Sequence, residues 1–293
     1  MILVRLMGGL GNQMFQYALG RKLSLLHNTD LFMDTSFLDK SSKTHVKREY
    51  ELYIFDLPAS LAGEKELDKF EGIRKSTIKS RLQHVLPSLM PYHIITESSH
   101  AFDPKILRSP ENTLLVGFWQ TEKYFIDIED SIRNDFKFSQ AFDVENKAIA
   151  EKIISSHSVS LHVRRGDYVS NSDIQKHHGI CSIEYYNMAL SQITSKHKNV
   201  ELFVFSDEPE WVKQNMRFDL PATYITRNRD KTASIDMHLM SLCKHNIIAN
   251  SSFSWWAAWL NGYKDKIVIA PKNWVADKTL NTNDVIPDNW IKI

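Results

Sequence analysis

Two adjacent arginines stand at the end of an expected strand in the second half of the chain. In SLHVRRGDYV, residues 160–169, apolar and polar side chains alternate up to Arg164 and Arg165. His162 lies inside the strand, and Asp167 follows a glycine turn. Guanidinium groups bind phosphate through paired hydrogen bonds, and open α/β sheets bind ligands at the carboxyl ends of strands. The segment therefore predicts a phosphate site. The alternative, solvated arginines at a surface strand end, fits poorly with a strand that reads as buried.

Carboxylates follow two other expected elements. The apolar strand ELFVF, residues 201–205, leads into Asp207 and Glu208. Asp236 stands in the first turn of a helix expected over residues 234–244, where the helix dipole favours a negative charge. Helix capping fully explains one of these residues. The others could accept hydrogen bonds from a nucleic base or from ribose hydroxyls.

Three serines lead from a strand expected over residues 246–249 into a tryptophan-rich helix. Ser251, Ser252 and Ser254 place hydroxyl groups beside the main-chain N–H groups of a helix N-terminus, and a phosphate needs both kinds of donor. Capping accounts for one serine but not for three. Together with the arginines and the carboxylates, these serines predict a site for a nucleoside diphosphate.

The N-terminal stretch combines a strand, a glycine-rich loop and a helix. Residues 2–7 are apolar, GGLGNQ fills residues 8–13, and apolar residues then recur at helical spacing. The start of such a helix, with Gly11 and Asn12, suits an anion or a sugar, and a tight connection without a ligand fits equally well. Met14 stands where the dinucleotide fingerprint has its third glycine, and no P-loop lysine follows.

The order of elements predicts two α/β domains. After residue 155, strands and helices alternate, which is typical of a doubly wound parallel sheet. A helix expected over residues 144–155 leads into this half, so we place the boundary there and expect domains 1–155 and 156–293. The first half has strand patterns at residues 2–7, 30–34, 93–96 and 113–119 and helix patterns at residues 13–27 and 122–133, whereas residues 40–92 are uninformative.

Composition excludes several classes of function. The 293 residues carry a net charge of +1, which argues against a general nucleic-acid-binding protein. No run of 18 apolar residues occurs and the N-terminus lacks signal-peptide features, so we expect a cytoplasmic protein. The chain has no Asp-x-Asp pair, and His177, His178 and Cys181 have no evident fourth ligand beside them, so we expect no metal.

Four motifs together resemble the bacterial α-1,2-fucosyltransferases, of the glycosyltransferase family 11 type. The motifs are GGLGNQ at residues 8–13, HVRRGDY at 162–168, FSDE at 205–208 and NSSFSWW at 250–256. That family transfers L-fucose from GDP-fucose to the 2-hydroxyl of a terminal galactose, with inversion at the anomeric carbon. The resemblance implies a GT-B-like α/β fold, in which two Rossmann-like domains face each other across a cleft. Residues 1–155 would form the acceptor side and residues 156–293 would bind GDP-fucose.

The resemblance also implies a role for each matching residue. Arg164 would grip the β-phosphate, and His162 would lie against the nucleoside. Asp236 would accept hydrogen bonds from guanine, and Asp207 or Glu208 would approach the ribose or the base. Asp167 is the first candidate for a general base. The catalytic set is thus Arg164, Asp167 and His162, and the remaining donor contacts come from Gly11, Asn12, Ser251, Ser252 and Phe253.

The expected partners are GDP-fucose and a galactose-terminated glycan such as an O-antigen unit. A lipid-linked acceptor would bring the enzyme to a membrane surface, and no metal cofactor or nucleic acid is expected. Three alternatives remain open. The chain could use another sugar nucleotide or form another linkage, bind GDP without catalysis, or act as a lectin through the aromatic residues around Trp255.

Overall fold

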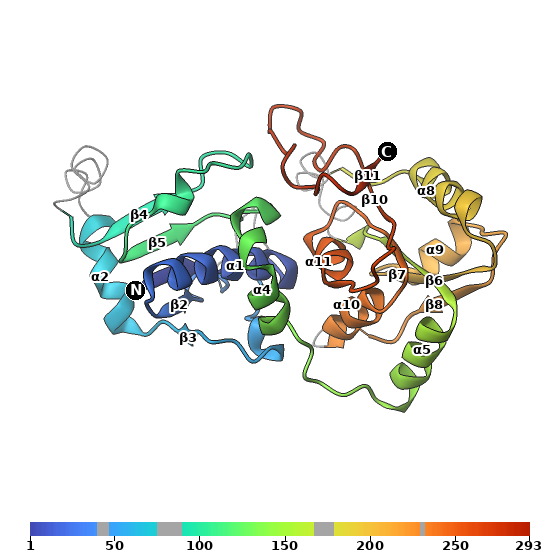
Figure 1. Cartoon of the computed structure of the whole chain (residues 1–293), viewed down its shortest axis with the longest axis horizontal. Helices are drawn as coiled ribbons and strands as arrows, with labels where there is room; N and C mark the ends of the chain where they lie inside the picture. Colours follow the sequence, from blue (N-terminus) through green and yellow to red (C-terminus); the bar gives the residue numbers. More distant parts are fainter. Residues whose placement is uncertain (40–46, 75–89, 167–178, 229–231) are drawn as a thin grey trace. The chain divides into compact units, whose positions relative to one another are not determined.

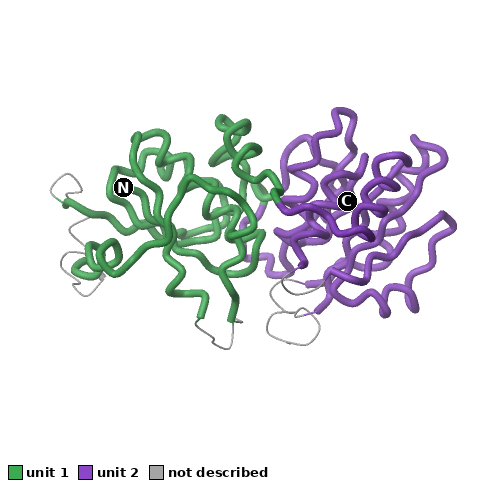
Figure 2. Tube along the Cα trace, turned by 90° about the horizontal axis from the view of Figure 1, so that it is seen from below, with its two compact units in different colours: residues 1–139, 283–285 green, residues 140–282, 286–293 purple. Residues whose placement is uncertain are grey.

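The computed structural model describes residues 1–39, 47–74, 90–166, 179–228 and 232–293 (Figure 1). The chain divides into two compact units (Figure 2). The first comprises Met1–Ser139 and Asn283–Val285, and the second comprises Gln140–Thr282 and Ile286–Ile293. Helix α5 (Val144–Ser155) packs on elements of the second unit, so this unit begins one helix earlier than the boundary we place at residue 155.

The first unit contains a five-stranded parallel sheet in the order β3-β2-β1-β5-β4. The central strand β1 pairs Ile2 with Leu31 on one side and with Thr113 on the other. The strands are β1 (Ile2–Arg5), β2 (Leu31–Asp34), β3 (Ser60–Leu61), β4 (His93–Thr96) and β5 (Thr113–Val116).

Helices cover both faces of this sheet. Helix α1 packs on the face of Val4, and Gly20 permits the close approach, because a Cβ at Gly20 would lie 2.5 Å from Val4 Cγ1. Helix α2 covers the opposite face, where Phe70 packs in one apolar cluster with Leu3. The helical elements are α1 (Leu10–His27), α2 (Glu64–Arg74), α4 (Glu129–Asp135) and the short 3-10 turns η1 (Leu52–Ile54), η3 (Ile106–Arg108), η4 (Glu122–Tyr124) and η5 (Ile126–Ile128).

Two expectations for the first half are corrected. The strand expected to reach residue 119 ends at Val116, because the Glu97 carboxylate accepts the main-chain N–H groups of Phe118 and Trp119 at 2.7 and 2.9 Å. Trp119 has a left-handed φ of 57°, which turns the chain away from the sheet. The single helix expected over residues 122–133 is instead divided into η4, η5 and α4.

A short segment near the end of the chain completes the first unit. Asn283–Val285 belongs to this unit, although the residues on either side of it belong to the second. The Asp284 carboxylate accepts the main-chain N–H of Phe102 at 2.8 Å and a hydrogen bond from Lys123 Nζ at 2.5 Å. These two contacts fasten the returning segment to elements that are more than 150 residues earlier in the chain.

The second unit confirms the doubly wound parallel sheet that the sequence predicts. Its six strands are ordered β11-β10-β9-β6-β7-β8, and all pair in parallel. Strands β8 and β11 were not expected, because β8 is only half-buried and β11 has two residues. The strands are β6 (His157–Val163), β7 (Val200–Ser206), β8 (Ala222–Ile225), β9 (His245–Ile247), β10 (Val268–Ala270) and β11 (Ile291–Lys292).

Strand β6 and helix α11 contribute many of the buried side chains of the second unit. Every residue of β6 after His157 is buried. Trp255, Trp256 and Trp259 of α11 are buried against one another, which explains the tryptophan-rich pattern. None of the helices in the described ranges is both long and apolar enough to cross a bilayer. The helices of this unit are α5, α8 (Ile183–Lys196), α9 (Pro209–Asn215), α10 (Ala233–Ser241) and α11 (Ser252–Leu260).

Candidate active site

The carboxyl ends of three neighbouring strands meet at one edge of the second sheet. Strand β6 lies between β7 and β9, and the register pairs Val163 with Ser206 and Leu161 with Ile247. Along the chain, β7 and β8 are added on one side of β6, and β9, β10 and β11 on the other. The strand order therefore reverses between β6 and β9. Open α/β sheets bind ligands outside the strand ends at such a switch point.

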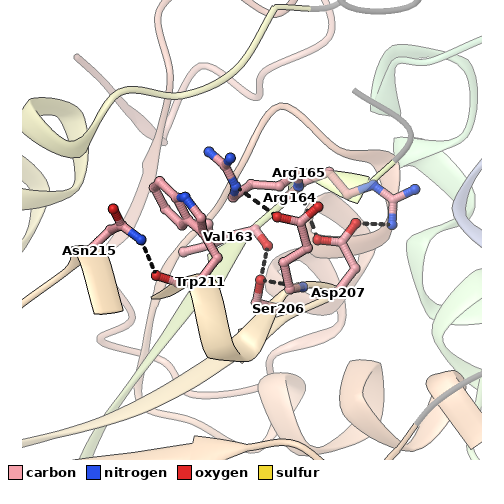
Figure 3. A network of polar contacts seen from close by, with 8 residues as sticks. Val163, Arg164, Arg165, Ser206, Asp207, Trp211 and Asn215 are labelled. Carbon is pink, nitrogen blue, oxygen red and sulfur yellow. Dashed lines mark hydrogen bonds and ion pairs between the residues drawn. The ribbon is translucent and has the colours of Figure 1, made fainter. Parts of the chain in front are cut away.

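Arg164 leaves β6 at this edge and meets a carboxylate from the end of β7. Its Nη1 lies 3.0 Å from Asp207 Oδ2, and the main-chain N–H of Arg165 donates to Asp207 Oδ1 at 3.0 Å (Figure 3). The Arg164 and Asp207 side chains are 25% and 24% exposed. Asp207 thus orients a guanidinium that still reaches solvent. The sequence suggests a contact between Asp207 and the ribose or the base, and orienting Arg164 is a further role.

Gly166 leaves room for the Asp207 carboxylate. A Cβ at Gly166 would lie 2.6 Å from Asp207 Oδ2, which is shorter than any ordinary contact between these atom types. Any other residue at this position would therefore displace the carboxylate that orients Arg164.

Arg165 points away from Arg164 and is held by two groups at the start of α9 (Figure 3). Its guanidinium carbon lies 3.4 Å from the centroid of the Trp211 ring, and its Nε donates to Glu208 Oε2 at 3.0 Å. A guanidinium stacked on an aromatic face gains both cation–π attraction and apolar contact. The sequence suggests that Glu208 contacts the ribose or the base of the sugar nucleotide. In the structure its carboxylate pairs with Arg165.

His162 is a buried imidazole beside Arg164. Its exposed fraction is 5%, and its Nδ1 is buried without a hydrogen-bond partner within the described part of the chain. Burial, and to a smaller extent the Arg164 charge, lowers the pKa of His162 to about 3. The ring is therefore neutral, and a buried polar atom of this kind costs free energy until a ligand group pairs with it. Phe253 lies beside it, with the ring centroids 5.7 Å apart.

The serines predicted to face a phosphate do lie at a helix N-terminus. Ser251 is the N-cap of α11, with extended backbone at φ −138°, and its side chain makes no capping hydrogen bond. Ser252 is the first helical residue. Ser254 turns inward, where its hydroxyl lies 3.2 Å from the Ser251 carbonyl oxygen. The main-chain N–H groups of the first turn are thus left to bind an anion, with two serine hydroxyls beside them.

Asp236 lies in the first turn of α10, as the sequence predicts. Its Oδ1 accepts a hydrogen bond from Asn228 Nδ2 at 2.7 Å, and Asn228 is in turn bonded to Asn146. Burial raises the pKa of Asp236 to about 7, and the hydrogen bond from Asn228 opposes this rise. A half-buried carboxylate with one oxygen already oriented suits recognition of adjacent N–H groups on a planar ring.

Gly11 and Asn12 belong to the first unit, at the start of α1. Gly8 has a left-handed φ of 74°, and a Cβ there would lie 2.3 Å from Asn12 Nδ2. Asn12 Oδ1 accepts a hydrogen bond from Gln120 Nε2 at 2.7 Å. The buried Gln13 donates to the Gly8 carbonyl at 2.9 Å, so the loop is held rigidly whether or not it binds a ligand.

Two sequence predictions concern residues outside the described ranges. Asp167 and the histidine pair before Cys181 fall within residues 167–178. Cys181 itself is described, and its Sγ donates to Asn250 Oδ1 at 3.5 Å. Burial raises the pKa of the Cys181 thiol to about 11, which disfavours the thiolate that a metal would need.

Three other histidines gather at the amino ends of β6 and β9, opposite the edge that carries Arg164. The candidate metal-binding atoms of His157, His197 and His245 lie within 4.8 Å of one another. However, Nδ1 of His245 accepts the main-chain N–H of Ile267 at 3.0 Å, so a neutral ring carries its proton on Nε2. That Nε2 lies 3.2 Å from Nε2 of His157. A hydrogen bond between the two rings accounts for this contact without a metal.

Sequence reasoning missed the residues that position the site. Trp211 reads as an ordinary aromatic residue of a short helix, and Asn146 and Asn228 are 82 residues apart. A weak signal existed for Asn228, because it follows β8 at the same sheet edge as the other site residues. Asn228 could be predicted as a site residue only from a sequence pattern that identifies β8 as a strand, and the pattern of β8 is weak.

Relatives of known family resemble this chain over its full length. An alpha-1,2-colitosyltransferase of Escherichia coli is 34% identical, and the match covers 100% of this chain and 98% of the relative. The O-antigen biosynthesis glycosyltransferase WbnK of Escherichia coli is 32% identical over 98% of this chain and 99% of the relative. The fold is that of solved fucosyltransferases. A variant of Arabidopsis thaliana FUT1 in complex with GDP matches 93% of this chain and 71% of its own, with a TM-score of 0.53 and 13% identity. NodZ from Bradyrhizobium matches 87% of this chain and 91% of its own, with a TM-score of 0.51 and 15% identity.

These likenesses confirm the fold class that the four motifs predict, a GT-B-like chain with two Rossmann-like halves. The model of the family described as "Glycosyl transferase family 11" matches residues 65–293, which include the arginine pair, the β7 carboxylates and the serines of α11. The chain therefore belongs to glycosyltransferase family 11.

Proposed function

We propose that this glycosyltransferase moves L-fucose from GDP-fucose to the 2-hydroxyl of a terminal galactose on an O-antigen-type glycan. The observation that carries the proposal is the set of groups at the switch point of the second sheet. A guanidinium, a buried imidazole nitrogen that has no partner among the described residues, and a helix N-terminus lie at neighbouring strand ends, and such groups suit a nucleoside diphosphate. An alpha-1,2 linkage and an O-antigen setting are supported by the names of the two Escherichia coli relatives.

In this proposal the leaving group is GDP. Negative charge grows on the β-phosphate as the bond to the sugar breaks, and Arg164 and the first turn of α11 would stabilise it. Both are fixed before the donor arrives, Arg164 by Asp207 and the helix N-terminus by the packing of its tryptophans. Preorganised donors of this kind lower the barrier because they need no reorientation in the transition state.

The nucleoside would be recognised by one half-buried group and one buried group. The Asp236 carboxylate would accept from N1–H and the 2-amino group of guanine, and His162 Nδ1 would pair with a donor or acceptor of the nucleoside. Asp167 stays the first candidate for the general base, and Arg164 with the N-terminus of α11 would make a metal unnecessary. GDP bound to the Arabidopsis FUT1 variant and to NodZ supports a GDP-linked donor.

A second donor is favoured by one comparison. The relative that is 34% identical over the full length is an alpha-1,2-colitosyltransferase. Colitose is L-fucose without its 3-hydroxyl. In this second proposal the donor would be GDP-colitose, and GDP would again be the leaving group. If colitose were the natural donor sugar, then the groups described here would keep their roles, and only contacts to the 3-position would differ.

A donor assay tests both candidates. The purified protein would be incubated in excess EDTA with lactose and either GDP-fucose or GDP-colitose, and the products analysed by mass spectrometry. A fucosylated trisaccharide with the new bond at the 2-position is the expected result. A preference for GDP-colitose by at least tenfold in kcat/KM would replace the first proposal with the second. If neither donor were consumed and GDP failed to bind, the proposed function would be refuted. The cytoplasmic location and the lipid-linked acceptor stay predictions.

A further inference from the structure

Asp236 is the end of a short chain of hydrogen-bonded side chains. Asn228 Nδ2 donates both to Asp236 Oδ1, at 2.7 Å, and to Asn146 Oδ1, at 3.0 Å. Asn146 Nδ2 donates back to Asn228 Oδ1 at 3.1 Å. The two amides therefore exchange a pair of hydrogen bonds, and the second N–H of Asn228 is directed at the carboxylate.

This arrangement leaves the Asn228 amide only one orientation. Asn146 is fully buried and Asn228 is 8% exposed, so neither amide can exchange these partners for water. If Asn228 were turned over, its carbonyl oxygen would face the Asp236 carboxylate and the two hydrogen bonds with Asn146 would be lost. The pair thus presents a donor, and not an acceptor, to Asp236.

The backbone that carries the two asparagines is fastened separately. Asp143 caps α5 by accepting the Asn146 N–H at 2.8 Å, and its other oxygen lies 3.1 Å from Arg227 Nη2. Arg227 also forms an ion pair with Glu145. Arg227 and Asn228 are therefore tied to the start of α5 by charged groups as well as by the amides. These exposed contacts stabilise the backbone, whereas the buried amide pair sets the orientation of the Asn228 side chain.

Burial leaves Asp236 dependent on its neighbour. The charged and titratable groups on the described elements around Asp236 are Asp143, Glu145, Lys147, Glu151 and Lys152 at α5, Arg227 after β8 and His238 on α10 itself. Arg227 pairs with Asp143 and Glu145, and Lys152 pairs with Glu201. His238 stacks on Phe142 with the ring centroids 4.4 Å apart, and burial lowers its pKa to about 4, so it is neutral. α11, which packs on α10, carries no charged side chain. Within the described part of the chain, the hydrogen bond from Asn228 is what favours the ionised carboxylate.

We infer that Asn146 and Asn228 are positioning residues that orient Asp236 toward the edge of the base and so set the preference of the site for guanine. The inference rests on the proposed function. An ionised carboxylate with one oxygen held by Asn228 can accept from N1–H and from the 2-amino group together. Hypoxanthine lacks the 2-amino group and would lose one of these two hydrogen bonds. Adenine presents a lone pair at N1, which a carboxylate repels.

The test compares the dissociation constants of GDP and IDP by titration calorimetry between about pH 5.5 and about pH 8. Both ligands carry the same diphosphate, so its titration cancels in the ratio of the two constants. The wild-type protein should bind GDP about tenfold more tightly than IDP at the upper end of this range. The preference should fall as the pH decreases, because a protonated Asp236 can no longer accept both hydrogen bonds.

Asn228→Ala should reduce the preference for GDP to about twofold and move its midpoint to higher pH, since the neutral form of Asp236 is then favoured. Asn146→Ala should shift both quantities in the same direction by a smaller amount, and it provides a second variant if Asn228→Ala does not fold. Asp143→Ala is the matched control. It removes the cap of α5 and a partner of Arg227, so it should lower Tm while leaving the GDP preference and its midpoint unchanged.

The possible results separate the two proposals. If folded Asn228→Ala and Asn146→Ala proteins keep the wild-type preference and midpoint, the positioning role is wrong and the proposed function stands. If Asp143→Ala changes the preference as much as Asn228→Ala does, general loosening of the segment explains the effect and the inference is also overturned. A wild-type protein that does not bind GDP refutes the proposed function itself.

Discussion

Replacement by alanine should have different effects at the two neighbouring arginines, on turnover at Arg164 and on stability at Arg165. Arg164→Ala removes a guanidinium that reaches solvent at the strand end, whereas Arg165→Ala removes one that is stacked on Trp211 and bonded to Glu208. We expect the first substitution to abolish turnover with little loss of stability. We expect the second substitution mainly to lower the stability of the fold.

The magnitudes follow from the surroundings of each group. The Arg164–Asp207 pair is about a quarter exposed on each side, so it contributes about 0.2–1 kcal/mol to stability, which corresponds to a Tm change of at most about 4 °C. Losing a preorganised phosphate donor costs about 10²–10³ in kcat. For Arg165, whose side chain is 16% exposed, the cation–π contact and the ion pair contribute about 1 kcal/mol each. The resulting loss of about 2 kcal/mol lowers Tm by about 4–8 °C.

The assay measures kcat with GDP-fucose and Tm on the same preparations. A double-mutant cycle with Trp211→Leu isolates the stacking, and we expect a coupling free energy of about 1 kcal/mol between Arg165 and Trp211. The reasoning is refuted if Arg165→Ala keeps the wild-type Tm, or if Arg164→Ala keeps wild-type turnover. Coupling near zero would show that the contact with Trp211 does not hold Arg165 in place.

Three further predictions concern the same unit. Gly166→Ala should lower kcat by about tenfold or more with a normal fold, because its Cβ would displace the carboxylate that orients Arg164, and circular dichroism checks the fold. Turnover should be unchanged by excess EDTA and by later addition of Mg²⁺, and any metal-dependent recovery would contradict the proposed role of Arg164. Stability should fall as the pH decreases below about 6.5, because burial lowers the pKa of His245 to about 4 and the unfolded chain then binds a proton that the native state does not. His245→Asn keeps an acceptor for the Ile267 N–H but does not titrate, so urea unfolding at pH 7 and pH 5 should show a smaller acid loss, by up to about 1.4 kcal/mol per pH unit. An equal loss in the variant would show that His245 does not contribute.

The groups that face a ligand could be predicted from the sequence because they follow buried strands. Arg164 comes directly after β6, Asp207 after β7 and Ser251 shortly after β9, and the apolar pattern of each strand is strong. In a parallel sheet the carboxyl ends of these strands must lie at one edge, so local pattern was sufficient to bring the residues together.

The groups that hold those residues in place could not be predicted in the same way. The stacking of Arg165 on Trp211 and the amide pair of Asn146 and Asn228 depend on how helices pack on the sheet, which no local pattern specifies. The early end of the strand expected over residues 113–119 has a similar origin, since the strained backbone of Trp119 is stabilised by Glu97 from another strand end. Tertiary contacts overrode local propensity at both places.

The return of Asn283–Val285 to the first unit affects how the protein can be made. An N-terminal domain ordinarily folds on the ribosome while later residues are still being added. Here the first unit lacks the contacts of Asp284 until residues 140–282 of the second unit have been synthesised. Neither unit corresponds to one uninterrupted segment of the gene product, so expressing residues 1–139 alone would produce a first unit whose Phe102 and Lys123 have lost a shared partner.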